Sequence, residues 1–365
     1  MQVGIVGSGI IGLSIADELL RHGNAVTLFD PAPAGSEASQ AAAGMLAPQL
    51  EATAPGPLLQ LCLHSRELYA QWQARLSQAS GLSLDYRQNG ALKLAFTATE
   101  LKALETEVAW QQTQSLRARL LSPAETLARE PALNPSLLGA AYFPDEAQID
   151  SARVVQALAQ VVEKMGGRWV REAVEHLDET SGRITGVRTP SGQHRFDAVV
   201  LCAGSWSGLI NGRTGLNENS VFPVRGQLAA LSCSQVSLSH VIVGAQGYLV
   251  TRPNRFIAGT TTERVGYQKA VTPEGLRHML AVATTLCPAL QTAKVELTWS
   301  GLRPAASDPG PILGRSPLPG LFLATAHFRN GILLAPLTAR LLRECLREQA
   351  CSVDLEPFRY NRFSP

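Results

Sequence analysis

The sequence predicts an α/β fold in which a Rossmann-like, dinucleotide-binding lobe is interleaved with an α+β lobe built on an antiparallel sheet. The first lobe is indicated by a glycine-rich turn between an apolar run and a helical pattern near the N-terminus. The second lobe is indicated by alternating segments between residues 222 and 261, which are typical of antiparallel strands. Strand and helix patterns of the first kind return near residues 151 and 321, so the chain passes between the lobes repeatedly.

The N-terminal segment carries the strongest pattern. The short apolar run from Val3 to Val6 is typical of a buried parallel strand, and Gly7-Ser8-Gly9-Ile10-Ile11-Gly12 follows it, before a helical pattern at residues 13–20. In such a motif Gly7 permits the tight turn, Gly9 lets the backbone approach a pyrophosphate, and Gly12 lets helix and strand pack closely. The free amides and the positive end of the helix would then face the phosphates.

A second strand and an acid complete this motif. The apolar residues 25–29 end in Asp30, about twenty residues beyond the glycines, where an acid hydrogen-bonds the ribose of an adenine dinucleotide. Strand, glycines, helix, strand and acid in this order predict a bound dinucleotide. The following residues 31–48 are small and have two interpretations: a flexible linker, or backbone that lies flat against the ligand.

The next stretch predicts a structural helix and then the first part of the second lobe. Helical periodicity covers residues 57–76. Beyond it, Asn89-Gly90 indicates a turn, residues 91–96 alternate as a strand, and residues 101–120 predict a helix. Ser122 followed by proline is typical of a further helix N-terminus.

Residues 151–204 return to the first lobe. A helix is expected at 151–165, followed by a strand at 168–170 and by residues 174–177, which we expect to continue the same sheet. Residues 184–190 and 193–196 predict a hairpin. The apolar strand after Asp197 ends in Ala203-Gly204, which indicates either a second backbone approach to the cofactor or a buried strand with a turn.

The remaining elements close both lobes. Residues 222–233, 241–261 and 297–299 predict the antiparallel sheet, and residues 273–287 a helix that covers it. A strand at 321–325 and an apolar helix at 332–346 present another helix N-terminus, whose dipole would stabilise negative charge on a bound ring. The alternation divides the chain into first-lobe segments 1–83, 146–219 and 301–365 and second-lobe segments 84–145 and 220–300.

Composition and charge argue against a nucleic-acid-binding protein, a membrane-spanning protein and a zinc protein. Hydrophobic residues make up 45% and charged residues 17% of the chain, as in an ordinary globular protein, and a net charge of +2 gives no electrostatic case for nucleic acid. No apolar stretch approaches the ~18 residues that span a bilayer. Six cysteines without C-x-x-C spacing argue against a zinc site. Because the first strand starts at residue 2, we expect no signal peptide and a cytoplasmic protein with reduced thiols.

Four motifs in order carry a family resemblance. They are V-G-I-V-G-S-G-I-I-G at the N-terminus, A-A-A-G-M-L-A-P at residues 41–48, W-S-G-L-R-P at residues 299–304 and H-F-R-N-G-I-L-L-A-P at residues 327–336. Together they resemble the FAD-dependent amine and amino-acid oxidases related to D-amino acid oxidase and sarcosine oxidase, and most of all the glycine-oxidising branch of thiamine biosynthesis. The resemblance covers nearly the whole chain. It implies non-covalent FAD, with the isoalloxazine ring at the lobe boundary.

The resemblance also implies roles for single residues. Arg303 would pair with the substrate carboxylate, Tyr248 would hydrogen-bond it, and Arg329 would lie beside the site. No residue is expected to act as a catalytic acid or base, because hydride passes directly to the flavin. The expected FAD-binding residues are Gly7, Gly9, Ile10, Ile11, Gly12, Asp30, Ser39, Ala43, Gly44, Met45, Val174, Ala203, Gly204, His327, Phe328, Arg329, Asn330, Gly331, Ile332 and Leu333.

Two positions depart from the family pattern. Ala38-Ser39 stands where the family has a hydroxyl-rich pair, and Gln246 stands where some relatives have histidine.

The activity that this resemblance implies is oxidative deamination of glycine, sarcosine and small D-amino acids. The products would be an imine, which yields glyoxylate and ammonia from glycine, and hydrogen peroxide from dioxygen. The glycine imine would supply the thiazole of thiamine. The resemblance implies a homo-oligomer, a tetramer in much of the family, and neither a membrane nor a nucleic-acid partner.

Three other readings are kept open. A related flavin dehydrogenase of D-amino acids, proline or glycine would pass electrons to quinone, and the lack of a basic amphipathic helix argues against it. A nicotinamide-dependent dehydrogenase would explain the first motif but not residues 41–48 or 327–336. A flavin-binding assembly subunit without turnover would leave Arg303 and Tyr248 without a role.

Overall fold

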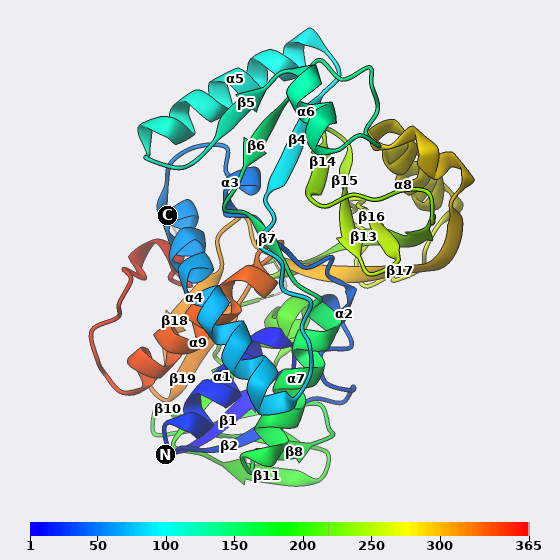
Figure 1. Ribbon diagram of the computed structural model, residues 1–365. Coiled ribbons are helices and arrows are strands. Elements are labelled where there is room, and N and C mark those ends of the chain that lie inside the picture. Colours follow the sequence, from blue (N-terminus) through cyan, green and yellow to red (C-terminus); the bar gives the residue numbers. More distant parts are fainter. Residues whose placement is uncertain (218, 364–365) are drawn as a thin grey trace.

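A computed structural model describes residues 1–217 and 219–363, and its chain forms two lobes (Figure 1). The first lobe contains a six-stranded sheet of order β18-β19-β12-β1-β2-β8. Its central strands β12, β1 and β2 run parallel, while β18 is antiparallel to β19. The strands are β1 (Gln2–Val6), β2 (Ala25–Phe29), β8 (Arg168–Val170), β12 (Ala198–Leu201), β18 (Ile312–Arg315) and β19 (Leu321–Thr325).

Both faces of this sheet are covered, which explains why its strands are continuous apolar runs. Helices form a layer on one face, and their apolar side chains share one core with Val3, Ile5 and Leu28 of the sheet. The opposite face, with Val6, packs against a three-stranded sheet of order β11-β10-β9. The helices are α1 (Ile10–Arg21), α4 (Pro57–Ser80), α7 (Ser151–Lys164) and α9 (Gly331–Leu346); the small sheet consists of β9 (His176–Thr180), β10 (Arg183–Thr189) and β11 (Gly192–Arg195).

The second lobe is built on an eight-stranded sheet of order β17-β13-β16-β15-β14-β4-β6-β5. All its neighbouring strands are antiparallel except β14 and β4. Helices α5 (Ala98–Thr113), α6 (Pro123–Arg129) and α8 (Pro273–Leu286) lie on it (Figure 1). The strands are β4 (Ala91–Ala95), β5 (Arg119–Leu121), β6 (Gly139–Phe143), β13 (Phe222–Ser232), β14 (Val241–Gly244), β15 (Gly247–Arg252), β16 (Arg255–Gly259) and β17 (Lys294–Ala305).

Two of the segments that pass between the lobes are paired with each other. Strand β3 (Met45–Leu46) is antiparallel to β7 (Ala147–Gln148), with Met45 opposite Gln148. Short helices α2 (Ala38–Ala41) and α3 (Pro48–Glu51) flank β3. The small-residue stretch at 31–48 is therefore ordered structure and not a flexible linker.

Two expectations about single elements are wrong, and one strand of the main sheet was not expected. The helix expected at 101–120 ends at Thr113, because Ser115 has a φ of 58° and the chain turns there into the edge strand β5. Residues 174–177 do not continue the main sheet; His176 and Leu177 belong to β9, which pairs with β10 in the separate small sheet. Strand β18 was not expected, and it extends the main sheet beyond β19.

Two further findings concern what the described residues lack. None of the helices in the described ranges is long and apolar enough to cross a lipid bilayer. Residues 1–217 and 219–363 also contain no group of three His, Cys, Asp or Glu side chains placed to hold a metal ion.

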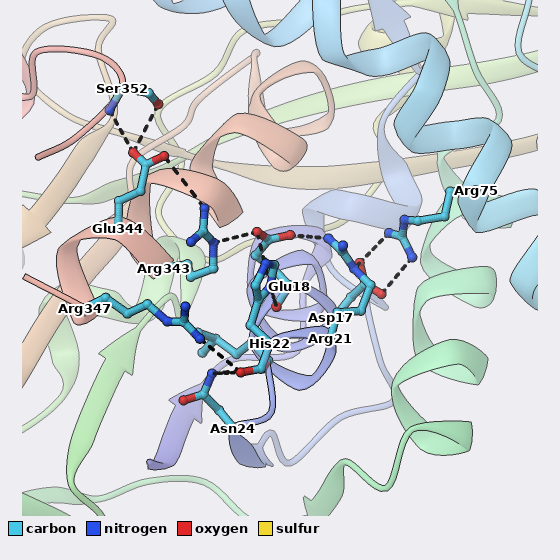
Figure 2. A network of polar contacts seen from close by, with 11 residues as sticks. Asp17, Glu18, Arg21, His22, Asn24, Arg75, Arg343, Glu344, Arg347 and Ser352 are labelled. Atoms are coloured by element: carbon cyan, nitrogen blue, oxygen red, sulfur yellow. Dashed lines mark hydrogen bonds and ion pairs between the residues drawn. The ribbon is translucent and has the colours of Figure 1, made fainter. Parts of the chain in front are cut away.

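A network of charged side chains joins α1 to its neighbouring helices (Figure 2). The carboxylate of Asp17, whose side chain is 1% exposed, accepts two hydrogen bonds from the guanidinium of Arg75 on α4, at 2.5 and 3.2 Å. The next residue, Glu18, accepts a 2.8 Å hydrogen bond from Nε of Arg343 on α9. Helix α1, which follows the glycine turn, is thus tied to two helices by charge as well as by packing.

We predict that Asp17→Asn lowers the free energy of unfolding by about 3 kcal/mol, because it leaves the charge of Arg75 without its buried partner. Chemical unfolding at a fixed cofactor concentration measures this. The matched control is Glu356→Gln, whose carboxylate forms a solvent-exposed pair with Arg359 and whose loss should leave stability nearly unchanged. Equal stability of the two variants would contradict a structural role for the network.

Candidate functional site

A cavity of about 580 Å³ lies between the two lobes. Asp30 and Val174 of the first lobe line it, and so do Tyr248 and Arg303 of the second-lobe sheet. The cavity therefore runs from the carboxyl ends of β1 and β2 to the lobe boundary. In open α/β sheets, the carboxyl ends of the strands are where ligands bind.

The glycine turn leaves no room for side chains. Gly7 has a φ of 105°, and a Cβ there would lie 2.4 Å from the carbonyl oxygen of Cys202. A Cβ on Gly12 would lie 2.0 Å from the carbonyl oxygen of Gly7, so Gly12 serves the contact between helix and turn. Gly7 and Gly9 line the cavity, where backbone alone faces the ligand space.

Asp30 fixes the shape of the turn and keeps acceptor capacity. Its Oδ2 accepts hydrogen bonds from the backbone N–H and the hydroxyl of Ser8, at 2.8 and 2.9 Å. Its Oδ1 accepts one from the backbone N–H of Ala32 at 3.0 Å. A carboxylate has about four lone-pair positions. Asp30 can therefore hold the loop and still accept a hydroxyl from a ligand in the cavity.

The small-residue stretch forms one wall of the cavity. Ser39 places its hydroxyl 2.9 Å from the backbone N–H of Ile10, the first residue of α1. Gly44 has a φ of 82°, and a Cβ there would lie 1.9 Å from the carbonyl oxygen of Ile149. Ala43, Gly44 and Met45 all line the cavity. Only a residue without a side chain fits at Gly44, which explains the composition of this segment.

Arg303 is a partly buried cation, and one of its terminal nitrogens has no partner. Its Nη2 donates to the hydroxyl of Thr260 at 2.7 Å and to the carbonyl of Thr261 at 3.0 Å. Its buried Nη1 has no hydrogen-bond partner among the described residues. Gly226 on the neighbouring strand makes room, since a Cβ there would lie 1.9 Å from Nη2. An unpaired, charged N–H donor beside a cavity suits an anion, because a hydrogen bond between a guanidinium and a carboxylate is strengthened by both charges.

Tyr248 and Arg329 lie beside this cation. Burial raises the pKa of Tyr248, so its hydroxyl stays protonated and can donate a hydrogen bond. Arg329 pairs with Glu51 of α3, with 3.3 Å between Nε and Oε2. Tyr248, Arg329 and Glu51 line the main cavity, and they also line an adjoining cavity of about 200 Å³. Gln246 lines the adjoining cavity as well.

The surroundings of His327 indicate a structural role. It is buried, and its Nε2 lies 3.1 Å from the hydroxyl of Thr338 on α9. Burial lowers the pKa of His327 to about 3. The neutral imidazole therefore persists through the ordinary pH range, which excludes it as a proton acceptor near neutrality. The residues on either side, Ala326 and Phe328, have φ values of 57° and 45°, so the chain turns sharply there.

The structure brings most of the expected site residues to the main cavity. The expected residues that line it are Gly7, Gly9, Ile10, Ile11, Asp30, Ser39, Ala43, Gly44, Met45, Val174, Ala203, Gly204, Tyr248, Arg303, His327, Phe328, Arg329, Gly331 and Ile332. Gly12, Asn330 and Leu333 lie outside this lining. Asn330 precedes α9 as its N-cap, and the Leu333 carbonyl accepts a hydrogen bond from the Ser65 hydroxyl.

The two residues that hold the arginines of the site were not anticipated. Thr260 holds the guanidinium of Arg303, and Glu51 pairs with Arg329. The sequence offered only weak signals for them: a run of three threonines at 260–262, and an acid just beyond the small-residue stretch.

Comparison with known families and structures gives a consistent result. The family described as FAD dependent oxidoreductase matches residues 2–345. Glycine oxidase of Geobacillus kaustophilus is 33% identical, and the match covers 99% of this chain and 97% of the relative. A crystal structure of glycine oxidase from Geobacillus kaustophilus has a TM-score of 0.95 at 32% identity, and covers 100% of this chain and 99% of the solved one.

Another similar protein is longer. The bifunctional protein ThiO/ThiG of Synechocystis is 37% identical over 98% of this chain, but the match covers only 53% of that relative. The chain thus spans about half the length of the bifunctional proteins that it matches. Iminodiacetate oxidase from Chelativorans has the same fold, with a TM-score of 0.89 and 26% identity over 98% of both chains.

We predict that His327 makes stability depend on pH. The unfolded chain binds a proton at this histidine below a pKa of about 6.5, whereas the folded chain does so only near 3. Its contribution is therefore complete above pH 6.5 and is lost as the pH falls towards 3, by at most about 1.4 kcal/mol per pH unit. His327→Asn should make the fall in unfolding free energy between pH 6.5 and 4.5 less steep by this amount.

The matched control is Thr338→Val, which removes the hydrogen-bond partner but keeps the imidazole. It should lower stability at every pH while the slope stays close to that of the unmodified protein. If His327→Asn leaves the slope unchanged, the histidine is not the group that titrates.

Proposed function

The chain belongs to the family of FAD dependent oxidoreductases, and we propose that it oxidises glycine, together with sarcosine and other small amino acids, for thiamine biosynthesis. The glycine oxidases that it resembles over nearly their whole length support this substrate. The relatives named ThiO/ThiG support the pathway. The single observation that carries the proposal is the unpaired guanidinium edge of Arg303 in the cavity at the lobe boundary.

The residues present fit FAD. Gly7 and Gly44 hold backbone conformations that bring bare main chain to the cavity wall, and neither tolerates a Cβ. Helix α1 starts at that wall, so its positive end and first amides can bind a pyrophosphate. We propose that Ile10, Ile11 and Ser39 hold the pyrophosphate, that Asp30 holds the ribose, and that Val174 contacts the adenine side.

The ring would lie against the other end of the cavity. We propose that residues 43–45 and 327–332 lie along the isoalloxazine, beside the N-terminus of α9. The positive end of that helix stabilises negative charge on a reduced ring. When bound, FAD supplies the two-electron acceptor of the reaction.

The chain's own part in the reaction is to orient the amino acid. The carboxylate would bind the free Nη1 of Arg303 and accept a hydrogen bond from the Tyr248 hydroxyl. Thr260 and the Thr261 carbonyl hold the guanidinium in place before substrate arrives, so little ordering is lost on binding. Arg329, already paired with Glu51, would lie at the rim of the site.

No protein group is required to remove a proton from Cα. The neutral substrate amine would push its lone pair into a C=N bond as a hydride leaves Cα for the flavin, which yields the protonated imine and oxidises the amino acid by two electrons. Water then converts the imine of glycine to glyoxylate and ammonia. We propose that dioxygen takes the two electrons, together with two protons, and becomes hydrogen peroxide.

The six cysteines, all free thiols, support a reducing cytoplasmic location.

A spectrum of the purified protein tests the proposal most directly. Flavin absorption should bleach after anaerobic addition of glycine and return when air is admitted. Bleaching that air does not reverse would indicate a quinone-linked dehydrogenase instead. No bleaching with glycine, sarcosine or small D-amino acids would reject the proposed substrate class.

We predict that Arg303→Ala raises KM for glycine by roughly 100-fold, because the substrate carboxylate loses its charged hydrogen-bond partner. Arg303→Lys should raise KM about tenfold, since an ammonium keeps the charge but cannot be held in place as the planar guanidinium is. FAD content should stay normal in both. The control is Arg264→Ala, an exposed arginine that stacks on Phe222, which should leave KM unchanged. An unchanged KM in Arg303→Ala would exclude the assignment.

A further inference from the structure

Arg252 is a buried cation without a carboxylate partner. It is 8% exposed and donates to four neutral oxygens. These are Gln148 Oε1 at 2.9 Å, the Thr251 carbonyl at 2.9 Å, the Ile149 carbonyl at 2.7 Å and the Ala43 carbonyl. Burial lowers the pKa of Arg252 to about 10, which leaves it charged near neutrality. A buried charge with only neutral partners is costly, and such cost is expected where it serves a function.

The charged groups around Arg252 do not neutralise it by contact. Asp85 pairs with Arg87 at 3.0 Å, and Asp150 pairs with Arg153 at 3.6 Å. Asp150, Asp85, Arg87 and Arg255 act on Arg252 only through space. Across the described part of the chain, no carboxylate lies within 4.0 Å of its guanidinium.

The position of Arg252 links the two halves of the site. It lies on β15 four residues beyond Tyr248, and the period of two in a strand puts both on one face. From there its guanidinium reaches the paired crossing segments, where it bonds the carbonyls of Ala43 and Ile149. Ala43 and Gly44 line the cofactor cavity, whereas Arg252 does not.

The contact with Ala43 acts on one peptide group. The carbonyl of Ala43 and the N–H of Gly44 belong to the same planar trans peptide, so they point in opposite directions. The Ala43 carbonyl points to Arg252, which does not line the cavity, whereas Gly44 does; the geometry therefore points to a Gly44 N–H that is turned towards the cavity. Within residues 1–217 and 219–363, this N–H has no hydrogen-bond acceptor. A charged donor on the carbonyl makes the N–H of the same amide a stronger donor.

We propose that Arg252 is a positioning residue that aims and polarises the Gly44 N–H towards bound FAD, and so favours negatively charged states of the cofactor. Preorganised donors in a site shielded from water act strongly on such charge. The proposal rests on FAD binding by this family and not on the identity of the amine substrate.

The test uses sulfite and the purified holoprotein. Sulfite forms a negatively charged adduct with oxidised flavin, and it needs no amine, so the result is independent of the proposed substrate. We expect Arg252→Gln to raise the sulfite Kd about tenfold, or about 1.4 kcal/mol. Arg252→Lys keeps the charge and should stay within about threefold of the unmodified protein. The midpoint potential of the flavin should fall in Arg252→Gln.

The matched control is Arg87→Gln. Arg87 lies next to Arg252 and donates to the Thr251 carbonyl at 2.6 Å, but it does not contact the cavity wall. Its loss should leave the sulfite Kd within about threefold. This separates the contact with Ala43 from the general loss of a neighbouring cation.

An Arg252→Gln holoprotein with unchanged sulfite affinity overturns the proposal. If Arg252→Gln does not retain flavin, Arg252→Lys decides: sulfite affinity within about threefold supports the proposal, and a tenfold loss rejects it. If neither variant retains flavin, Arg252 is a structural clamp only, and the proposal is rejected.

Discussion

The structure depends on a close contact between three pieces of backbone. The turn at Gly7 packs against the end of β12 at Cys202, and the first turn of α1 packs against Gly7 through Gly12. No side chain fits between them. This contact sets where α1 begins and therefore where its first amides face the cavity. The charged network at the far end of α1 then ties the same helix to α4 and α9. The cofactor end of the site is consequently held by both packing and charge.

The cations near the cavity have two different kinds of hydrogen-bond partner. Arg329 on the rim has a carboxylate partner in Glu51. Arg252 is buried and Arg303 is partly buried, and both are held by hydroxyl, amide and carbonyl oxygens. Neutral acceptors fix the direction of a guanidinium but do not cancel its charge. The second-lobe sheet therefore carries positive charge towards the site while it keeps that charge rigid, which suits the recognition of an anion and the stabilisation of charge on a ring.

The fold could be predicted because its strongest signals are local. The glycine turn, the run at 25–29 with Asp30, and the final strand and helix each follow from periodicity and spacing. The limits of α5 and the sheet to which β9 belongs could not be predicted. The first depends on a turn at Ser115 and the second on which partner strand lies nearby, and neither is encoded in periodicity.

For the site, family motifs indicated Arg303 and Tyr248, but not the residues that hold them. Thr260 and Glu51 act through contacts that form only when both lobes are assembled. Arg252 lies outside the motifs and reaches the cavity wall through a carbonyl, so residue type alone gives no signal for it.

The hydroxyl of Ser39 has a consequence for how the cofactor enters and leaves. It accepts the hydrogen bond of the Ile10 amide, one of the groups available to a phosphate at the start of α1. When a phosphate accepts a hydrogen bond from this amide, it replaces the bond to Ser39 and does not satisfy a donor that was unpaired. Release of the cofactor therefore leaves the Ile10 amide with a hydrogen-bond partner, at little cost in free energy. The Ile10 amide therefore adds little net affinity for the cofactor, while the positive end of α1 still stabilises a bound phosphate, so the cofactor can exchange without leaving this amide unpaired.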